Sequence, residues 1–368
     1  MWNDSLKKNI PWIDTVRVSA SLMIITAHYF MCEGFANRPF LANRALELAI
    51  TGVFLFFAIS GLLIKPSLER SPSLWQFYKR KLIRIVVPFI VSYLILSIAL
   101  IFLALLNDHI ADRVPILHAM YSANYFSVFL GMFPVDLNVT KFFGLEVELF
   151  VGEWFMGVLL WLYLLSPFLI KCAEKFPIIS LLISIGISYA IFYATAELSA
   201  QGRLFGNWSI FLARVPEFLF GMILWIHSEK ILKLRRFLLP SCILYLAAWT
   251  TIFISDFLPH EEIFFPRDPS CFAITLPAIY CLFTAAELLN ERGSKILTWF
   301  NSFGGISYMA MLIQHVILFV FARQFNFQDL HTFGLILMFG IVTFAIVRVS
   351  DWIKKFSDPI ESWFAKGG

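Results

Sequence analysis

Long apolar segments without a charged residue constrain this chain more than any other feature of its sequence. Residues 85–107, 177–196, 237–255 and 269–286 contain no Asp, Glu, Lys or Arg. A helix needs about 20 mostly apolar residues to cross the hydrocarbon core of a bilayer. The apolar residues run continuously and do not alternate with polar ones, which excludes strands as the main spanning element. The sequence therefore predicts an all-α polytopic membrane protein.

Ten segments have the length and apolarity of a membrane span. They lie at 12–31, 47–65, 84–107, 154–172, 177–197, 204–227, 237–256, 269–290, 303–323 and 331–350. The composition agrees, because 59% of the 368 residues are hydrophobic and only 15% are charged. Such a composition excludes a disordered chain, a secreted disulfide scaffold and a nucleic-acid-binding domain. We expect one transmembrane domain over 1–368, with no separate extracytoplasmic domain.

The distribution of basic residues predicts the orientation. With ten spans, 21 of the 29 Lys and Arg residues fall on the side that holds both termini. Cytoplasmic loops carry an excess of basic residues, so both termini are expected in the cytoplasm. An eleventh span at 119–135 would place the basic cluster at 230–236 outside, so 119–135 is interpreted as a re-entrant or interfacial segment.

A polar stripe on the first predicted helix is the leading candidate site. Asp14, Arg17, Ser21 and His28 fall on one face at 100° per residue, and Arg17 and His28 are separated by about 16 Å along the axis. Such a stripe must face protein or a water-filled cavity. The structural alternative makes Arg17 a snorkelling anchor paired with Asp14, and His28 a buried structural residue.

A basic cluster marks the cytoplasmic end of the third segment. Lys79, Arg80, Lys81 and Arg84 stand at helical spacing, and such cations can hold the phosphates of a ligand such as a coenzyme A nucleotide. They can equally anchor the helix to anionic lipid head groups.

Other polar residues stand inside or beside predicted spans. Arg214 and Glu217 can pair at i,i+3 near the outer boundary, as a structural ion pair or a functional one. Glu153 opens the fourth segment, where it can orient a histidine or belong to a solvated rim. Tyr308 and His315 lie in the ninth segment. No local motif for a metal site, nucleotide hydrolysis or a serine hydrolase is present.

Taken in order, these motifs resemble the membrane acyltransferase 3 family. The resemblance includes D-x-x-R with a later His on the first helix, G-V-x-x-F-F-x-x-S-G on the second, and R-I-x-x-P on the third. The later elements are W-x8-Y-x3-P, R-x-P-E-F-x-x-G and G-x-I-S-Y with a following His. The residues that match are Asp14, Arg17, His28, Gly52, Val53, Phe56, Phe57, Ser60, Gly61, Arg84, Ile85, Pro88, Trp154, Tyr163, Pro167, Arg214, Pro216, Glu217, Phe218, Gly221, Gly304, Ile306, Ser307, Tyr308 and His315. The family's late His usually stands seven residues after the Ser, a place that Gln314 occupies here.

The resemblance implies transfer of an acyl group, commonly acetyl, from cytoplasmic acyl-CoA to a hydroxyl of an envelope polysaccharide or lipid-linked glycan. His28 would be the general base and Arg17 would hold the donor, while Arg80, Lys81 and Arg84 would bind the CoA phosphates. Asp14, Ser60, Glu153, Arg214, Glu217, Tyr308 and His315 would support them.

Acyl-CoA is then a donor substrate, and no bound cofactor is expected. The expected partners are acyl-CoA, the glycan acceptor and membrane lipids, without nucleic acid, and the expected location is the cell (plasma or inner) membrane. The sequence leaves the oligomeric state open. It also leaves one alternative function, a transporter or flippase that uses the polar stripe as a pathway.

Overall fold

The described part of the chain is helical. The structure, a computed structural model, describes residues 11–31, 39–106, 136–145, 151–204, 206, 209–227, 239–244, 247, 272–291, 293, 295–325 and 330–366. No strand occurs within these residues. The α-helices are α2 (Pro11–Met31), α3 (Pro39–Leu62), α4 (Ile64–Glu69), α5 (Leu74–Leu106), α8 (Leu137–Phe142), α9 (Glu153–Lys175), α10 (Pro177–Ala200), α11 (Val215–Ile226), α14 (Phe272–Glu291), α15 (Lys295–Asn301), α16 (Ser307–Gln324) and α17 (Thr332–Lys366). Two 3₁₀ turns, η4 (Phe211–Arg214) and η6 (Ser302–Ile306), precede α11 and α16.

Six helical segments of the described residues are long and apolar enough to cross a membrane. They are Leu48–Glu69, Leu74–Leu106, Trp154–Lys175, Pro177–Ala200, Lys295–Gln324 and Phe333–Ala365. A helical, multi-pass membrane protein is therefore confirmed. The count of ten spans and the cytoplasmic location of both termini stay predictions.

The remaining predicted segments differ in outcome. The first corresponds to α2, which is less apolar than the six because of its polar stripe, and the eighth corresponds to α14. The sixth, predicted over 204–227, holds η4 and the 12-residue helix α11, which at about 1.5 Å per residue is too short to cross alone. The seventh, 237–256, lies mostly outside the described residues, and 119–135 lies wholly outside them.

Helix α5 begins ten residues before the predicted start at 84. The Ser73 hydroxyl accepts a hydrogen bond from the backbone N–H of Gln76 at 3.2 Å, which caps the first turn. The apolar segment predicts only the part of the helix that can lie in the hydrocarbon core. The helix also includes the more polar residues 74–83 that precede this segment. The basic cluster at 79–84 lies on this helix, as its helical spacing predicts.

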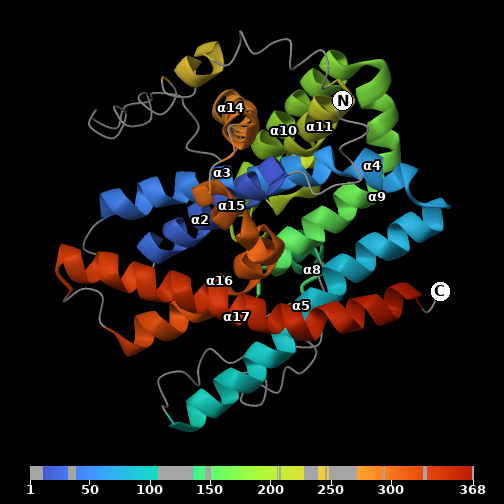
Figure 1. Cartoon of the computed structure of the whole chain (residues 1–368). Helices are drawn as coiled ribbons and strands as arrows, with labels where there is room; N and C mark the ends of the chain where they lie inside the picture. The colour runs from blue at the N-terminus through green and yellow to red at the C-terminus, as the bar shows by residue number, and fades with distance from the viewer. Residues whose placement is uncertain are drawn as a thin grey trace.

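The pair α2 and α3 lies in the middle of the bundle, between α11 on one side and α16 on the other (Figure 1). Glycines allow this packing. A Cβ at Gly52 would lie 2.7 Å from the Ala20 carbonyl oxygen, and a Cβ at Gly221 would overlap the Ala58 carbonyl. Small residues let membrane helices approach this closely, so α3 is clamped between α2 and α11.

A closed ring of hydrogen bonds fixes the N-terminal half of α2. Thr15 Oγ1 donates to Asn301 Oδ1 at 2.6 Å, Asn301 Nδ2 donates to Asn290 Oδ1 at 2.9 Å, and Asn290 Nδ2 donates to Thr15 Oγ1 at 2.9 Å. Each of the three side chains both donates and accepts within this ring. It ties α2 to α14 and α15 at the level of Asp14 and Arg17.

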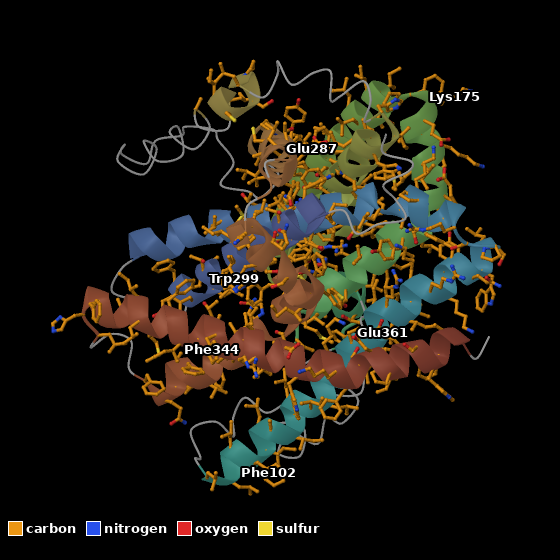
Figure 2. All side chains as sticks on the ribbon, viewed as in Figure 1. Phe102, Lys175, Glu287, Trp299, Phe344 and Glu361 are labelled. Atoms are coloured by element: carbon orange, nitrogen blue, oxygen red, sulfur yellow. The ribbon has the colours of Figure 1, made fainter. Side chains whose placement is uncertain are left out.

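Helix α17 crosses the whole width of the bundle (Figure 1) and continues well beyond the predicted span at 331–350. Its 35 residues give a length of about 52 Å. One face packs on the bundle through Leu335, Val342, Ile346, Ser350, Ile353 and Ser357. The same spacing leads to Glu361, labelled in Figure 2 near the end of α17. The other face exposes apolar side chains such as Phe344 and Trp352, which suits contact with lipid.

Candidate active site

The polar stripe of α2 faces protein. Asp14 and Arg17 form an ion pair at 3.0 Å, with roughly a third of the Arg17 side chain exposed. Ser21 is buried, and its hydroxyl donates to the Ser307 carbonyl at 3.0 Å. The prediction that the stripe faces the bundle is therefore confirmed, and the facing elements are η6 and α16.

Gly304 allows η6 to approach this stripe. A Cβ on that residue would lie 2.5 Å from the Asp14 Cβ. The end of η6 is closed by the Ser307 hydroxyl, which donates to the Gly304 carbonyl at 2.8 Å. The motif G-x-I-S-Y is thus a close-packing turn that sets the position of α16 against α2.

A histidine cluster lies further along α2. The rings of His28 and His315 meet edge to face, with centroids 4.0 Å apart and planes at 71°. Gln314 Nε2 lies 3.1 Å from Nδ1 of each ring, and the Gln314 side chain is fully buried. His28 Nδ1 also lies 2.9 Å from the Ile24 carbonyl oxygen. His28 is half-buried and His315 is exposed, so part of this cluster lies at the surface of the helical bundle.

A cationic cluster gathers at the other end of the stripe. Arg17 of α2 and Arg84 of α5 lie close enough to Lys81 to interact with it electrostatically, as does Arg70. The Lys81 ammonium stands over the Tyr163 ring, 4.9 Å from its centroid. The structure thus brings together α2 and α5, whose polar residues are more than 60 positions apart in the sequence.

Two predicted residues line this cationic cluster. The Ser60 and Tyr163 hydroxyls are hydrogen-bonded to each other, and Tyr163 interacts with Arg17 and Arg84. The Tyr308 hydroxyl donates to the Ile85 backbone carbonyl at 3.3 Å, one residue beyond Arg84. Ser60 and Tyr308 therefore lie beside the cations, where they can bind a polar part of a ligand.

Arg80 stands apart from the other predicted phosphate ligands. Its guanidinium is exposed and donates to the Arg70 carbonyl at 3.5 Å. Position 80 is rotated by about 100° from Lys81 around the helix, although at i,i+4 it shares a face with Arg84.

The predicted pair of Arg214 and Glu217 is formed, and it lies inside the protein. Nη1 of Arg214 lies 3.0 Å from Oε1 of Glu217, and both side chains are fully buried. The guanidinium also stacks over Phe54 of α3 and Phe192 of α10, 4.5 and 5.4 Å from the ring centroids. These contacts hold η4 and α11 to two neighbouring helices, which fits the structural interpretation of the pair.

Glu153 is the first residue of α9, in agreement with its predicted place at the start of the fourth segment, but its side chain lies outside the described part of the structure. The acidic neighbours that the sequence places near it, at 146 and 148, also lie outside. Its role therefore stays a prediction.

Sequence reasoning gave no role to three residues that line the site. Gln314 bridges the histidines, Tyr163 covers Lys81, and Glu361 of α17 interacts electrostatically with Arg84 and Tyr308. Glu361 accepts a hydrogen bond from Ser357 at 2.9 Å. The spacing of the inward face of α17 was a signal for Glu361. The family motifs already marked Tyr163 and the position of Gln314, but the contacts of these two residues needed the tertiary arrangement.

A comparison with models of known families decides the class. The family model of the acyltransferase domain that defines the acyltransferase 3 family matches residues 10–354 of the 368-residue chain. The chain belongs to the acyltransferase 3 family. It is therefore a membrane acyltransferase, and the transporter alternative receives no support. No curated protein and no solved structure matches the chain.

In this acyltransferase 3 protein, one helix carries both halves of the candidate site. Arg17 and His28 of α2 are about 16 Å apart along its axis. Arg17 belongs to the cationic cluster, and His28 belongs to the histidine cluster. This separation allows one group to hold a ligand by its charge while another performs chemistry on a distant atom of the same ligand.

Proposed function

We propose that this protein transfers an acyl group, most simply acetyl, from acyl-CoA to a hydroxyl of a cell-surface polysaccharide or lipid-linked glycan. The observation that carries the proposal is the arrangement along α2 of a cationic cluster, the polar stripe and a histidine pair. CoA has the matching layout, with phosphates at one end and a thioester at the end of a long, flexible arm.

The cationic cluster suits the phosphates of the acyl donor. Lys81 and Arg84 supply charges at i,i+3, and Arg80 can add a third contact from the exposed side. Arg17, oriented by its ion pair with Asp14, can hold a carbonyl or another polar group of the pantetheine arm. Ser60 and Tyr308 offer hydroxyls beside that path.

His28 suits the role of general base. A backbone carbonyl can only accept, so the contact with Ile24 places a proton on Nδ1 of His28 and leaves the lone pair on Nε2. An imidazole in this tautomer can take the proton from the acceptor hydroxyl as its oxygen attacks the thioester carbonyl. The geometry is compatible with direct transfer and with a transient acyl-histidine.

We place the protein in the plasma or inner membrane with the cationic cluster at the cytoplasmic face, where acyl-CoA is available. The clustering of basic residues supports this orientation. Lys65 of α4 pairs with Glu174 at the end of α9 at 2.6 Å, so the basic ends of these helices lie together with the start of α5.

The test is label transfer by the purified protein in nanodiscs. Radiolabelled acetyl-CoA is supplied with a panel of soluble and polyprenyl-linked oligosaccharides, and both labelled glycan and released CoA are measured. We expect label transfer by wild type and by His331→Ala, a control at an exposed histidine, and none by His28→Ala or Arg17→Ala. Wild type that transfers no acyl group from acetyl-CoA or succinyl-CoA to any acceptor would contradict the proposal.

A further inference from the structure

Gln314 lies between the two histidines, and its contacts constrain which nitrogen of each ring carries the proton. Its Nε2 atom lies at the same distance, 3.1 Å, from Nδ1 of His28 and Nδ1 of His315. Its Oε1 atom is buried and has no hydrogen-bond partner among the described residues. An amide nitrogen only donates, so each nearby ring nitrogen must either offer a lone pair or face a second donor.

The contact with Ile24 settles the proton of His28. Because the carbonyl oxygen at 2.9 Å only accepts, the hydrogen sits on His28 Nδ1. That nitrogen has no lone pair in the ring plane to offer to Gln314. The amide hydrogen therefore goes to Nδ1 of His315, which must accept it, and the proton of the His315 ring then sits on Nε2.

The opposite orientation of the amide is less favourable. It would place Oε1 between the two ring nitrogens and put the NH₂ group, with its two donors, at the buried place where Oε1 now has no hydrogen-bond partner. A buried donor pair without partners is more costly than one carbonyl oxygen without a partner, since orphaned N–H groups are rarer in proteins than under-satisfied carbonyls.

We propose that Gln314 holds His28 and His315 in opposite tautomers, so that one ring presents a lone pair and the other presents an N–H at Nε2. This inference rests on the proposed acyl transfer and deepens it. Gln314 is a positioning residue in this account. His28 and His315 would contact the reacting atoms, and one small acyl group can contact both rings because their centroids are only 4.0 Å apart.

The direct transfer step then balances. The acceptor hydroxyl oxygen forms a bond to the thioester carbonyl carbon, and its proton moves to His28 Nε2. The His315 Nε2–H donates to the carbonyl oxygen as negative charge develops on it. When the intermediate collapses, the C–S bond breaks, the CoA thiolate leaves, and it takes the proton back from His28.

Nitrogen NMR of the wild-type protein tests the tautomers directly. The protein is labelled with ¹⁵N-histidine in nanodiscs, and the signals are assigned from the spectra of His28→Asn and His315→Asn. We expect the proton of His28 on Nδ1 and that of His315 on Nε2. Protonation of His315 at Nδ1 would overturn the proposal, and this measurement does not depend on any variant of Gln314 being folded.

Variants of Gln314 test its positioning role. Gln314→Met keeps the volume and removes the amide, and Gln324→Met makes the same change at an exposed position of α16. We expect His315→Ala to lower kcat by about 10²–10³-fold, as for loss of one oxyanion donor. Gln314→Met should lower kcat towards that value without changing KM for acetyl-CoA, and the double variant should be no slower than His315→Ala.

These measurements distinguish a failure of the proposed role of Gln314 from a failure of the proposed acyl transfer. A Gln314→Met protein with wild-type kcat, or with an unchanged His315 tautomer, overturns the role of Gln314 while acyl transfer itself is still observed. A wild-type protein that transfers no acyl group overturns the proposed function, whatever the tautomers are.

Discussion

The buried ion pair of Arg214 and Glu217 gives a prediction whose size follows from its surroundings. Both side chains are fully buried, and the guanidinium stacks on Phe54 and Phe192. Removing one partner leaves the other charge inside the protein, at a cost of about 3–5 kcal/mol. Glu217→Leu should therefore lower the free energy of unfolding by that amount. Arg214→Met should lower it at least as much, because it also loses a cation–π contact of about 0.5–2 kcal/mol.

The double variant Arg214→Met with Glu217→Leu separates this cost from the value of the pair itself. It removes both charges and keeps apolar side chains of similar volume, a replacement that is often neutral or stabilising. We expect it to be clearly more stable than either single variant. The measurement is denaturant unfolding in detergent micelles, followed by tryptophan fluorescence, with wild type measured in parallel.

Two results would refute this reasoning. One is a single variant as stable as wild type, which would mean that water reaches the pair. The other is a double variant no more stable than the single ones, which would mean that the pair stabilises through specific geometry. Acyl transfer by the double variant is informative as well, because a stable but inactive protein would assign the pair to function and not to structure.

Three further predictions concern the acyl donor and the packing. Glu361→Gln should lower KM for acetyl-CoA by up to about fivefold, because the carboxylate competes with phosphate for the neighbouring Arg84 and such partly exposed pairs contribute about 0.2–1 kcal/mol. An unchanged KM would contradict this. Lys81→Ala should raise the KM for acetyl-CoA by about 10–100-fold, as expected for loss of a charge-assisted contact with phosphate. Arg80→Ala should raise it much less, because its guanidinium is exposed and donates to the Arg70 carbonyl. Equal effects of the two variants would contradict the different roles of these residues. Gly221→Ala should lower the free energy of unfolding by at least about 1–3 kcal/mol, because its Cβ would overlap the Ala58 carbonyl. Gly186→Ala is the control, because a Cβ there meets open space. Equal stability of the two variants in a thermal unfolding assay would argue against the close crossing of α3 and α11.

Helical periodicity was sufficient to predict the local parts of the site. The stripe of Asp14, Arg17, Ser21 and His28 lies on one helix, and Arg214 and Glu217 pair at i,i+3, because spacing within a helix fixes which side chains share a face. The apolar segments likewise predicted a helical membrane protein, since hydrocarbon requires every backbone group to bond within its own segment.

Contacts between distant segments were beyond the sequence pattern. Gln314 looks like an interruption in an apolar helix until α16 packs against α2, and Tyr163 becomes a ligand-site residue only when α9 meets α5. Glu361 stands beyond the last predicted span, because the apolar run ends before the helix does. The start of α5 was misplaced for the same reason, since a helix cap, not hydropathy, sets its first residue.

The central claim is that the cationic end of α2 holds the acyl donor while the histidine end performs the transfer. The most direct measurement compares acetyl-CoA binding, by calorimetry in nanodiscs, with label transfer for the same His28→Ala protein. We expect this protein to bind acetyl-CoA with a wild-type Kd and to transfer no acyl group. Label transfer at the wild-type rate by a folded His28→Ala protein would contradict it.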